Sequence, residues 1–222
     1  MNLVEEFTLL AYDDDGTPLT DGTHLDHGLG GGLLLELALA GRVDVEDKRV
    51  VVVDASPTGD PLVDAALAKI VGEDKARRPG HWVSKFAKET RPMVLARLVD
   101  EGILTTEKDK VLWVFPRIKY PAAHGVEPAQ EKAARDRMRR AVLDSGAVEP
   151  RTAALCALVA ATDLDKTVFG DLDRKAVKAR LREISEGAWA AAAVKKTIEE
   201  IQAAVMVAIV ASTTAATAGT SS

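Results

Sequence analysis

Apolar residues recur every three or four positions along most of the chain, the spacing that places them on one face of an α-helix. Only short stretches bounded by polar turns have the apolar, β-branched character of strands. The sequence therefore predicts a mainly α fold with short β-hairpins. Helices are expected over residues 3–12, 25–41, 61–71, 81–88, 91–101, 131–144, 151–162, 173–186 and 188–211.

The helix expected over residues 25–41 is apolar around nearly its whole circumference. A surface helix carries only one apolar stripe, so this helix should lie buried at the centre, with the others packed around it. Gly30, Gly31 and Gly32 each disfavour a helix by about 1 kcal/mol relative to Ala. We expect them where neighbouring backbone packs closely. Gly41 is expected just past the helix end, as its cap.

Two hairpins interrupt the helical pattern. The first is expected to pair residues 43–45 with 49–53 around a turn at 46–48, and the second to pair 103–107 with 111–115 around a turn at 108–110. The last strand is apolar on both faces, so either the core covers both of them or the hairpin projects. In the second case Leu112, Trp113, Val114 and Phe115 would contact a membrane or a second subunit.

The loop at residues 54–61 leads into a helix start, with Asp60 as N-cap and Pro61 as first helical residue. A loop that contains glycine and opens a helix can receive a phosphate. This one lacks the Gly-Lys-Ser/Thr ending of a phosphate-binding loop, and its aspartates would repel a phosphate. A capped turn is therefore the favoured interpretation.

The length of 222 residues suits one domain, and the chain has neither an internal repeat nor a long linker. We expect residues 1–211 to form this domain. Residues 212–222 are only Ala, Thr, Ser and Gly, a composition that predicts a disordered tail. The apolar stretches 33–40 and 203–211 are shorter than the roughly 20 residues that cross a bilayer.

The start of the sequence and its cysteine usage predict a cytoplasmic protein. The chain begins MNLVEEFTLL, with acids where a secretory signal needs basic residues. Its one cysteine, Cys156, stands in an apolar run and is expected to be a buried, inert thiol. A reducing compartment fits this cysteine usage.

The net charge of −5 is unevenly distributed. Residues 1–60 have a net charge of −10, residues 61–140 of +6, and residues 141–222 of −1. A basic middle in an acidic protein suggests one face that attracts anions. The alternative is that these Lys and Arg side chains only solvate helices.

Residue chemistry gives little support for a metal or a catalytic site. His24 and His27 can share a helix face near Asp21 and Asp26, but no third histidine or cysteine has a metal-binding spacing. We assign no metal, no cofactor and no catalytic residue. Because no nucleophile with a neighbouring base is apparent, an enzyme is a minor alternative.

A nucleic-acid binder is the other alternative. A helix at 91–101 followed by a hairpin is the order of a winged-helix DNA-binding domain. However, this helix offers only Arg91 and Arg97 as cations and ends in Asp100 and Glu101. The acidic net charge also opposes phosphate contacts, so we expect no nucleic-acid partner.

Three segments in this order and spacing resemble the Golgi phosphoprotein 3 family: residues 28–42, residues 54–60 and residues 98–108. In the last of these the chain reads LVDEGILTTEK. The resemblance covers roughly residues 3–210, and it is closest to the shorter prokaryotic branch. It implies helices around a central hydrophobic helix, with a projecting hairpin.

The resemblance also implies a function. Eukaryotic members of the family bind phosphatidylinositol 4-phosphate at the Golgi and help to retain glycosyltransferases there. By resemblance we expect a cytoplasmic, peripherally membrane-associated adaptor without enzymatic activity. Its partners would be an anionic-lipid or phosphoinositide membrane surface, protein cargo, and a second copy of the chain through the hairpin.

Four positions correspond to the family's lipid-headgroup pocket. Two basic residues of the family align with Lys88 and Arg91. A family tryptophan aligns with Asp21, and a family arginine aligns with Gly30. This pocket would therefore keep two cations, lack a third, and gain an acid.

Overall fold

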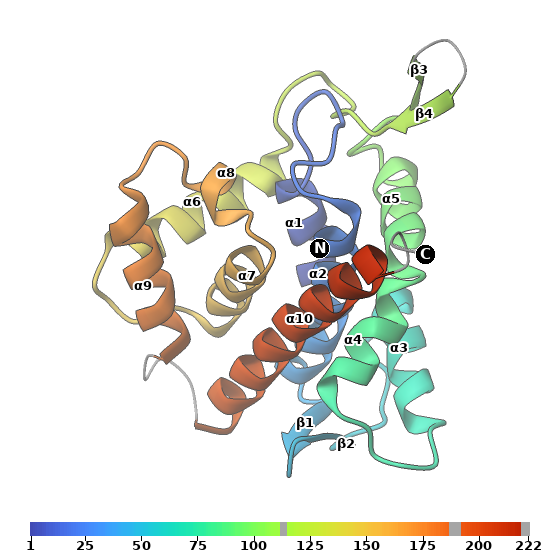
Figure 1. Cartoon of the computed structure of the whole chain (residues 1–222), viewed down its shortest axis with the longest axis vertical. Coiled ribbons are helices and arrows are strands. Elements are labelled where there is room, and N and C mark those ends of the chain that lie inside the picture. The colour runs from blue at the N-terminus through green and yellow to red at the C-terminus, as the bar shows by residue number, and fades with distance from the viewer. Residues whose placement is uncertain (112–114, 187–191, 219–222) are drawn as a thin grey trace.

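The computed structural model describes residues 1–111, 115–186 and 192–218. In these residues the prediction of a mainly α fold with short hairpins is confirmed (Figure 1). The elements are, in order, α1 (Leu3–Leu10), α2 (Gly22–Leu39), β1 (Val43–Glu46), β2 (Arg49–Val52), α3 (Pro61–Val71), α4 (Pro79–Ala87), α5 (Thr90–Asp100), β3 (Glu107–Val111), β4 (Phe115–Lys119), α6 (Ala129–Leu143), α7 (Pro150–Ala161), α8 (Asp165–Val168), α9 (Arg174–Glu186) and α10 (Ala192–Ala218).

Helix α2 is the central element, as its apolar composition predicts. It packs against α1, α4, α7 and α10, and these neighbours enclose it on several sides (Figure 1). Its side chains from Leu25 to Leu37 are buried almost without interruption, with Glu36 half-buried at one edge. Burial all round explains why α2 has no polar stripe.

Glycines in α2 allow neighbouring helices to approach closely, as expected. A Cβ atom on Gly30 would lie 2.3 Å from the carbonyl oxygen of Val83 in α4. A Cβ atom on Gly31 would lie 2.3 Å from a methyl group of Val205 in α10. Both distances are far below van der Waals contact, so α4 and α10 occupy space that a side chain would need.

Local sequence signals fix several helix ends. Asp60 accepts hydrogen bonds from the amides of Leu62 and Val63, so the predicted cap of α3 is confirmed. Gly41 has φ +68° just after α2, and Gly102 has φ +69° just after α5. Glycine adopts this left-handed conformation without the cost that a Cβ atom adds.

The first hairpin has the predicted turn, and the second does not. Strands β1 and β2 pair from Val43↔Val52 to Glu46↔Arg49, with Asp47 and Lys48 at positive φ. Strands β3 and β4 pair from Glu107↔Lys119 to Val111↔Phe115, so the predicted turn at residues 108–110 is wrong.

The charged segment at residues 108–110 lies instead in strand β3. The second hairpin projects away from the helices (Figure 1). Leu112, Trp113 and Val114, which were expected in a strand, connect β3 to β4 and lie outside the described residues. The fourth hairpin residue, Phe115, begins β4 and pairs with Val111.

Helix α10 is longer than predicted. It continues through residues 212–218, which were expected to belong to the tail. The expectation that no segment is long enough to cross a bilayer also needs correction. Lys196–Ala215 is a helical stretch of 20 residues that meets the criteria of length and composition. Its inner side chains Ile201, Val205 and Ile209 are buried in the core, which is common for core helices of this length.

The α2–α4 contact gives a stability prediction. Gly30→Ala should lower the free energy of unfolding by about 2 kcal/mol, because the new methyl group meets backbone atoms that cannot rotate away. Gly32→Ala is the matched control, since its Cβ atom would lie at ordinary contact distances of 3.4 Å or more. We expect Gly32→Ala to change stability by less than about 1 kcal/mol. Urea unfolding of both variants measures the difference, and equal stabilities would contradict the close approach.

Candidate functional site

The candidate headgroup residues lie where the start of α2 meets the joint between α4 and α5. Asp21 is the N-cap of α2, Lys88 is the C-cap of α4, and Arg91 lies in the first turn of α5. Arg91 Nη2 donates a 2.6 Å hydrogen bond to the carbonyl oxygen of Gly22, directly after Asp21. The fold therefore brings Arg91 to the α2 terminus, although these residues are distant in sequence.

Arg91 already has an anionic partner, which the sequence did not reveal. Its Nε atom lies 2.7 Å from Oδ1 of Asp26, one turn into α2. Burial raises the pKa of Asp26 above its usual value, and the positive charge of Arg91 only partly offsets this. An approaching phosphate would have to compete with the Asp26 carboxylate for Arg91.

Asp21 occupies the helix terminus that could otherwise receive an anion. Its Oδ1 accepts hydrogen bonds from the amides of Thr23 and His24, at 2.8 and 3.1 Å, and its carboxylate also pairs with the His24 ring. Burial alone would raise the pKa of Asp21, but the His24 amide and ring together hold it below its usual value. The carboxylate thus stays ionised at the exposed end of α2.

Gly30 contributes close packing to this region and no charge. It is buried against Val83 and Ala87 of α4, and Ala87 directly precedes Lys88. A side chain at this position would collide with the α4 backbone, so position 30 cannot supply a cation in this structure.

Lys88 is the exposed cation of the group. Among the residues that the structure describes, no carboxylate forms an ion pair with it, whereas Lys85 one turn earlier lies 3.7 Å from Glu73 and over the Trp82 ring. Lys88 is therefore available to an external anion in a way that Arg91 is not.

The hairpin is connected to this region through its base. The Tyr12 and Tyr120 rings pack edge to face with centroids 6.2 Å apart, and Lys119 Nζ lies 3.1 Å from Asp15. Burial raises the pKa of Tyr12 to about 12, although nearby Arg91 lowers it. The base of the hairpin and the start of α2 thus share one end of the molecule.

The two histidines considered as metal ligands are used by the fold. His27 Nδ1 lies 2.8 Å from the Thr23 carbonyl oxygen, and its Nε2 lies 3.3 Å from Ser212 Oγ in α10. His24 pairs with Asp21 and lies 3.8 Å from Asp163. Within the described part of the chain, no cluster of three His, Cys, Asp or Glu side chains could hold a metal ion.

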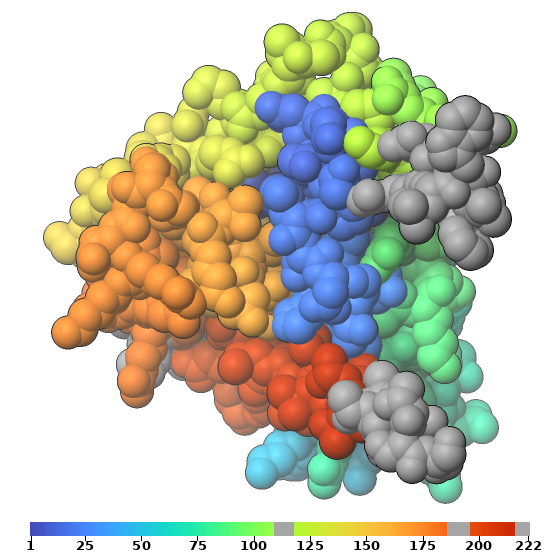
Figure 2. Space-filling view, turned by 45° about the horizontal axis from the view of Figure 1, so that its top comes forward, coloured from blue at the N-terminus to red at the C-terminus, as the bar shows by residue number. Residues whose placement is uncertain are grey.

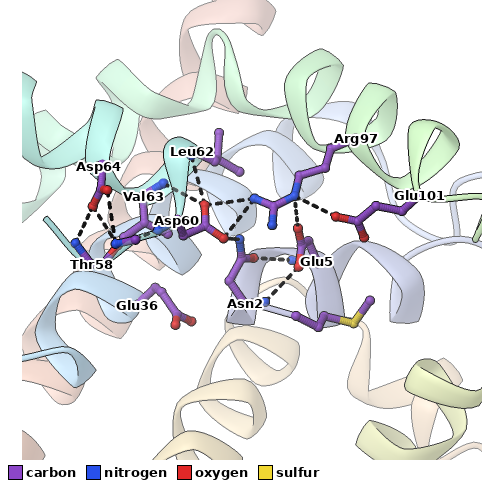
Figure 3. Close-up of polar contacts among 12 residues, drawn as sticks. Asn2, Glu5, Glu36, Thr58, Asp60, Leu62, Val63, Asp64, Arg97 and Glu101 are labelled. Carbon is purple, nitrogen blue, oxygen red and sulfur yellow. Dashed lines mark hydrogen bonds and ion pairs between the residues drawn. The ribbon is translucent and has the colours of Figure 1, made fainter.

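A second polar cluster, around α1, is closed by its own ion pairs (Figure 3). Arg97 Nε lies 2.8 Å from the fully buried Glu5, and its Nη1 lies 2.9 Å from Asp60. Asn2 caps α1 through Glu5 and also donates to Asp60. Burial raises the pKa of Glu5 above its usual value, despite the Asn2 amide and the Arg97 charge. This cluster is structural, because every member points to another member.

The same cluster argues against the nucleic-acid-binding alternative. Arg97 pairs with Glu5, Asp60 and Glu101, and Arg91 pairs with Asp26, so both cations of the supposed recognition helix are neutralised within the protein.

In the loop at residues 54–61, the amides of Thr58 and Gly59 donate to Asp64. The capped turn expected there is confirmed, and its amides are not directed at a phosphate.

Cys156 is 1% exposed, as expected for an inert thiol. Burial raises the pKa of this thiol to about 12. The thiolate form, which would be the reactive one, is therefore absent near neutral pH.

Comparisons with known proteins identify the family of this chain. Residues 3–201 match the model of the family described as Golgi phosphoprotein 3 (GPP34). The chain is also similar to vacuolar protein sorting-associated protein 74 of Eremothecium gossypii, with 29% identity over 148 residues. That match covers 55% of this chain and 44% of the relative, so the chain spans less than half of the relative's length.

The Arg91–Asp26 contact can be tested by titration. Arg91→Gln removes the positive charge that favours the ionised carboxylate, so the pKa of Asp26 should rise further. Carbon-13 NMR of the aspartate carboxyls measures this shift. Lys88→Gln removes the neighbouring exposed cation and is the control, with little expected change. A larger shift with Lys88→Gln than with Arg91→Gln would contradict the pairing.

Proposed function

Because the chain belongs to the Golgi phosphoprotein 3 family, we propose that it is a peripheral membrane protein that binds anionic lipid headgroups near Lys88 and Arg91. In this proposal it acts as an adaptor between a membrane surface and protein cargo, on the cytoplasmic face, and performs no catalysis. The family match and the arrangement of the headgroup positions support this reading over a nucleic-acid binder or an enzyme.

Lys88 carries the proposal. It is an exposed cation that aligns with a headgroup position of the family, it precedes Arg91 by three residues, and no carboxylate pairs with it in the described residues. An unpaired cation keeps its full attraction for a lipid phosphate, worth about 1 kcal/mol near an anionic surface. A paired cation such as Arg91 loses most of this attraction unless the lipid displaces its partner.

The headgroup region should discriminate poorly among acidic lipids. Specific recognition of a phosphate needs several convergent donors, and an arginine fork contributes more geometry than a lysine. Here Gly30 provides no cation, Asp26 pairs with Arg91, and Asp21 caps the helix terminus that Arg91 contacts. We therefore propose general attraction to anionic bilayers, with only a small preference for phosphatidylinositol 4-phosphate.

The hairpin has a proposed role in the same membrane contact or in self-association. Leu112, Trp113, Val114 and Phe115 are the residues concerned, and the first three lie outside the described residues. The support is the apolar sequence of this segment and the position of its base next to the start of α2.

A charge reversal tests the headgroup site. Lys88→Glu should reduce sedimentation with vesicles of phosphatidylcholine and phosphatidylserine roughly tenfold or more, because an attractive charge becomes repulsive. Lys175→Glu, on the exposed face of α9, makes the same charge change at a distant surface and should have a small effect. Equal losses in both variants would mean that net charge, and not this site, controls binding.

Selectivity is tested separately. The wild-type protein should bind vesicles with phosphatidylinositol 4-phosphate less than tenfold more tightly than charge-matched phosphatidylserine vesicles. Asp26→Asn should increase binding to both, by about threefold to fivefold, because Arg91 is then left without its carboxylate. A wild-type preference well above tenfold would show that other residues complete a selective pocket.

A further inference from the structure

The outer face of α10 is unusual for a surface helix. The residues from Ile201 to Ala218 include no Asp, Glu, Lys or Arg, although the helix is exposed along one side. Val207 is 68% exposed, Val210 is 63% exposed and Met206 is 51% exposed. Water contact with such a face brings no compensating hydrogen bonds, so a contiguous patch of this kind marks an interaction surface.

This face is open in the structure. Helix α10 crosses in front of α2 in Figure 1, and a strip of it lies on the molecular surface in Figure 2. Beside it, a trough of about 580 Å³ separates α10 from α4. Small and apolar residues line both walls of the trough, among them Pro79 and Gly80 from α4, and Ala204, Val207 and Ala211 from α10.

Exposed cations border the same face. Lys48 and Arg78 line the trough, together with the acid Glu200. Lys88 lies at the C-terminal end of α4, and neither it nor Lys48 nor Arg78 has an ion-pair partner in the residues that the structure describes. An apolar ridge with unpaired cations alongside it is the pattern of a helix that lies in the interfacial layer of an anionic membrane.

The ridge is continuous with the candidate headgroup site. Ser212 of α10 lies 3.3 Å from His27 of α2, and His27 directly follows Asp26, the partner of Arg91. The far end of the uncharged face therefore reaches the level of Lys88 and Arg91.

We propose that the outer face of α10, with Met206, Val207 and Val210 at its centre, inserts into the interfacial layer of an anionic lipid bilayer. This inference rests on the proposed lipid-binding function and names the apolar part of the contact. The uncharged stretch is about 27 Å long, enough for several turns to lie flat along the membrane. The inner face of the helix remains packed on α2 throughout.

A second copy of the chain is a less favourable occupant. A symmetric dimer brings the same patch of both subunits together. On the trough side of this face it would place two sets of Lys48, Arg78 and Lys88 near one another, and Glu200 is the only acid among the described residues that line the trough. On the other side of the face, the acids beside Met206 already share their hollow with Lys178 and Arg182. An anionic bilayer instead complements these cations along the trough side of the face.

The first test distinguishes the insertion of apolar side chains from electrostatic attraction to the membrane. The double variant Val207→Gln/Val210→Gln removes apolar surface without changing charge, at positions exposed enough for the fold to tolerate polar side chains. We expect at least a tenfold loss of binding to phosphatidylcholine–phosphatidylserine vesicles. Leu143→Gln is the matched control, since Leu143 is 64% exposed at the end of α6, and it should bind as the wild type does.

Insertion itself is measured with a fluorescent label. Val207→Cys can be labelled with an environment-sensitive dye because the native Cys156 is buried. The emission should shift to the blue when vesicles are added, and the same dye at Leu143→Cys should not shift. Unchanged emission at position 207 in protein that is bound to vesicles would overturn the proposal.

Failures of the two proposals are distinguishable. If Lys88→Glu abolishes binding and Val207→Gln/Val210→Gln does not, the headgroup site stands and the role of α10 is refuted. If the wild type binds no anionic vesicles, both proposals fail. If sedimentation equilibrium shows a lipid-free dimer that the double Gln variant dissociates, this face is a subunit interface and the membrane proposal is overturned.

Discussion

The close contact of α2 with its neighbours is the constraint on which the rest of the structure depends. Gly30 and Gly31 leave no room for side chains between α2 and the two helices α4 and α10. That contact fixes the position of α4 along the axis of α2. It therefore brings the joint between α4 and α5, which carries Lys88 and Arg91, to the start of α2. It also holds the inner face of α10 in the core, which leaves the opposite face exposed. A packing requirement thus positions residues that have no packing role of their own.

Buried carboxylates on α1 form the second set of constraints. Glu5 pairs with Arg97, and Glu6 pairs with Arg137 and Arg151 from α6 and α7. Removing one partner of such a pair leaves an uncompensated buried charge, which is far more costly than losing a surface ion pair. These contacts fix the orientation of α1 against several helices at once, and so they contribute specificity that apolar packing alone would not give.

The sequence predicts what depends on local rules. The turn of the first hairpin, the Asp60 cap and the burial of α2 all follow from residues close together in the chain. The turn of the second hairpin was misplaced because charged residues usually mark turns, whereas residues 108–110 here belong to strand β3. The Arg91–Asp26 pair was missed for a different reason: it joins helices whose relative placement is set by packing, and no sequence spacing encodes it. The sequence therefore names candidate site residues, whereas their ion-pair partners become known only from the fold.

The same reasoning changes the meaning of the charge distribution. The acidic first third and the basic middle suggest a segment with a strongly positive surface. In the folded protein the two segments neutralise each other through long-range pairs, including Lys119 with Asp15, Arg91 with Asp26 and Arg137 with Glu6. Attraction to an anion then depends on the cations that have no ion pair within the described part of the chain, such as Arg78 and Lys88. Because those cations lie beside the uncharged face of α10, our proposal of a membrane-facing side rests on the local coincidence of unpaired charge and exposed apolar surface, and not on the charge of a segment.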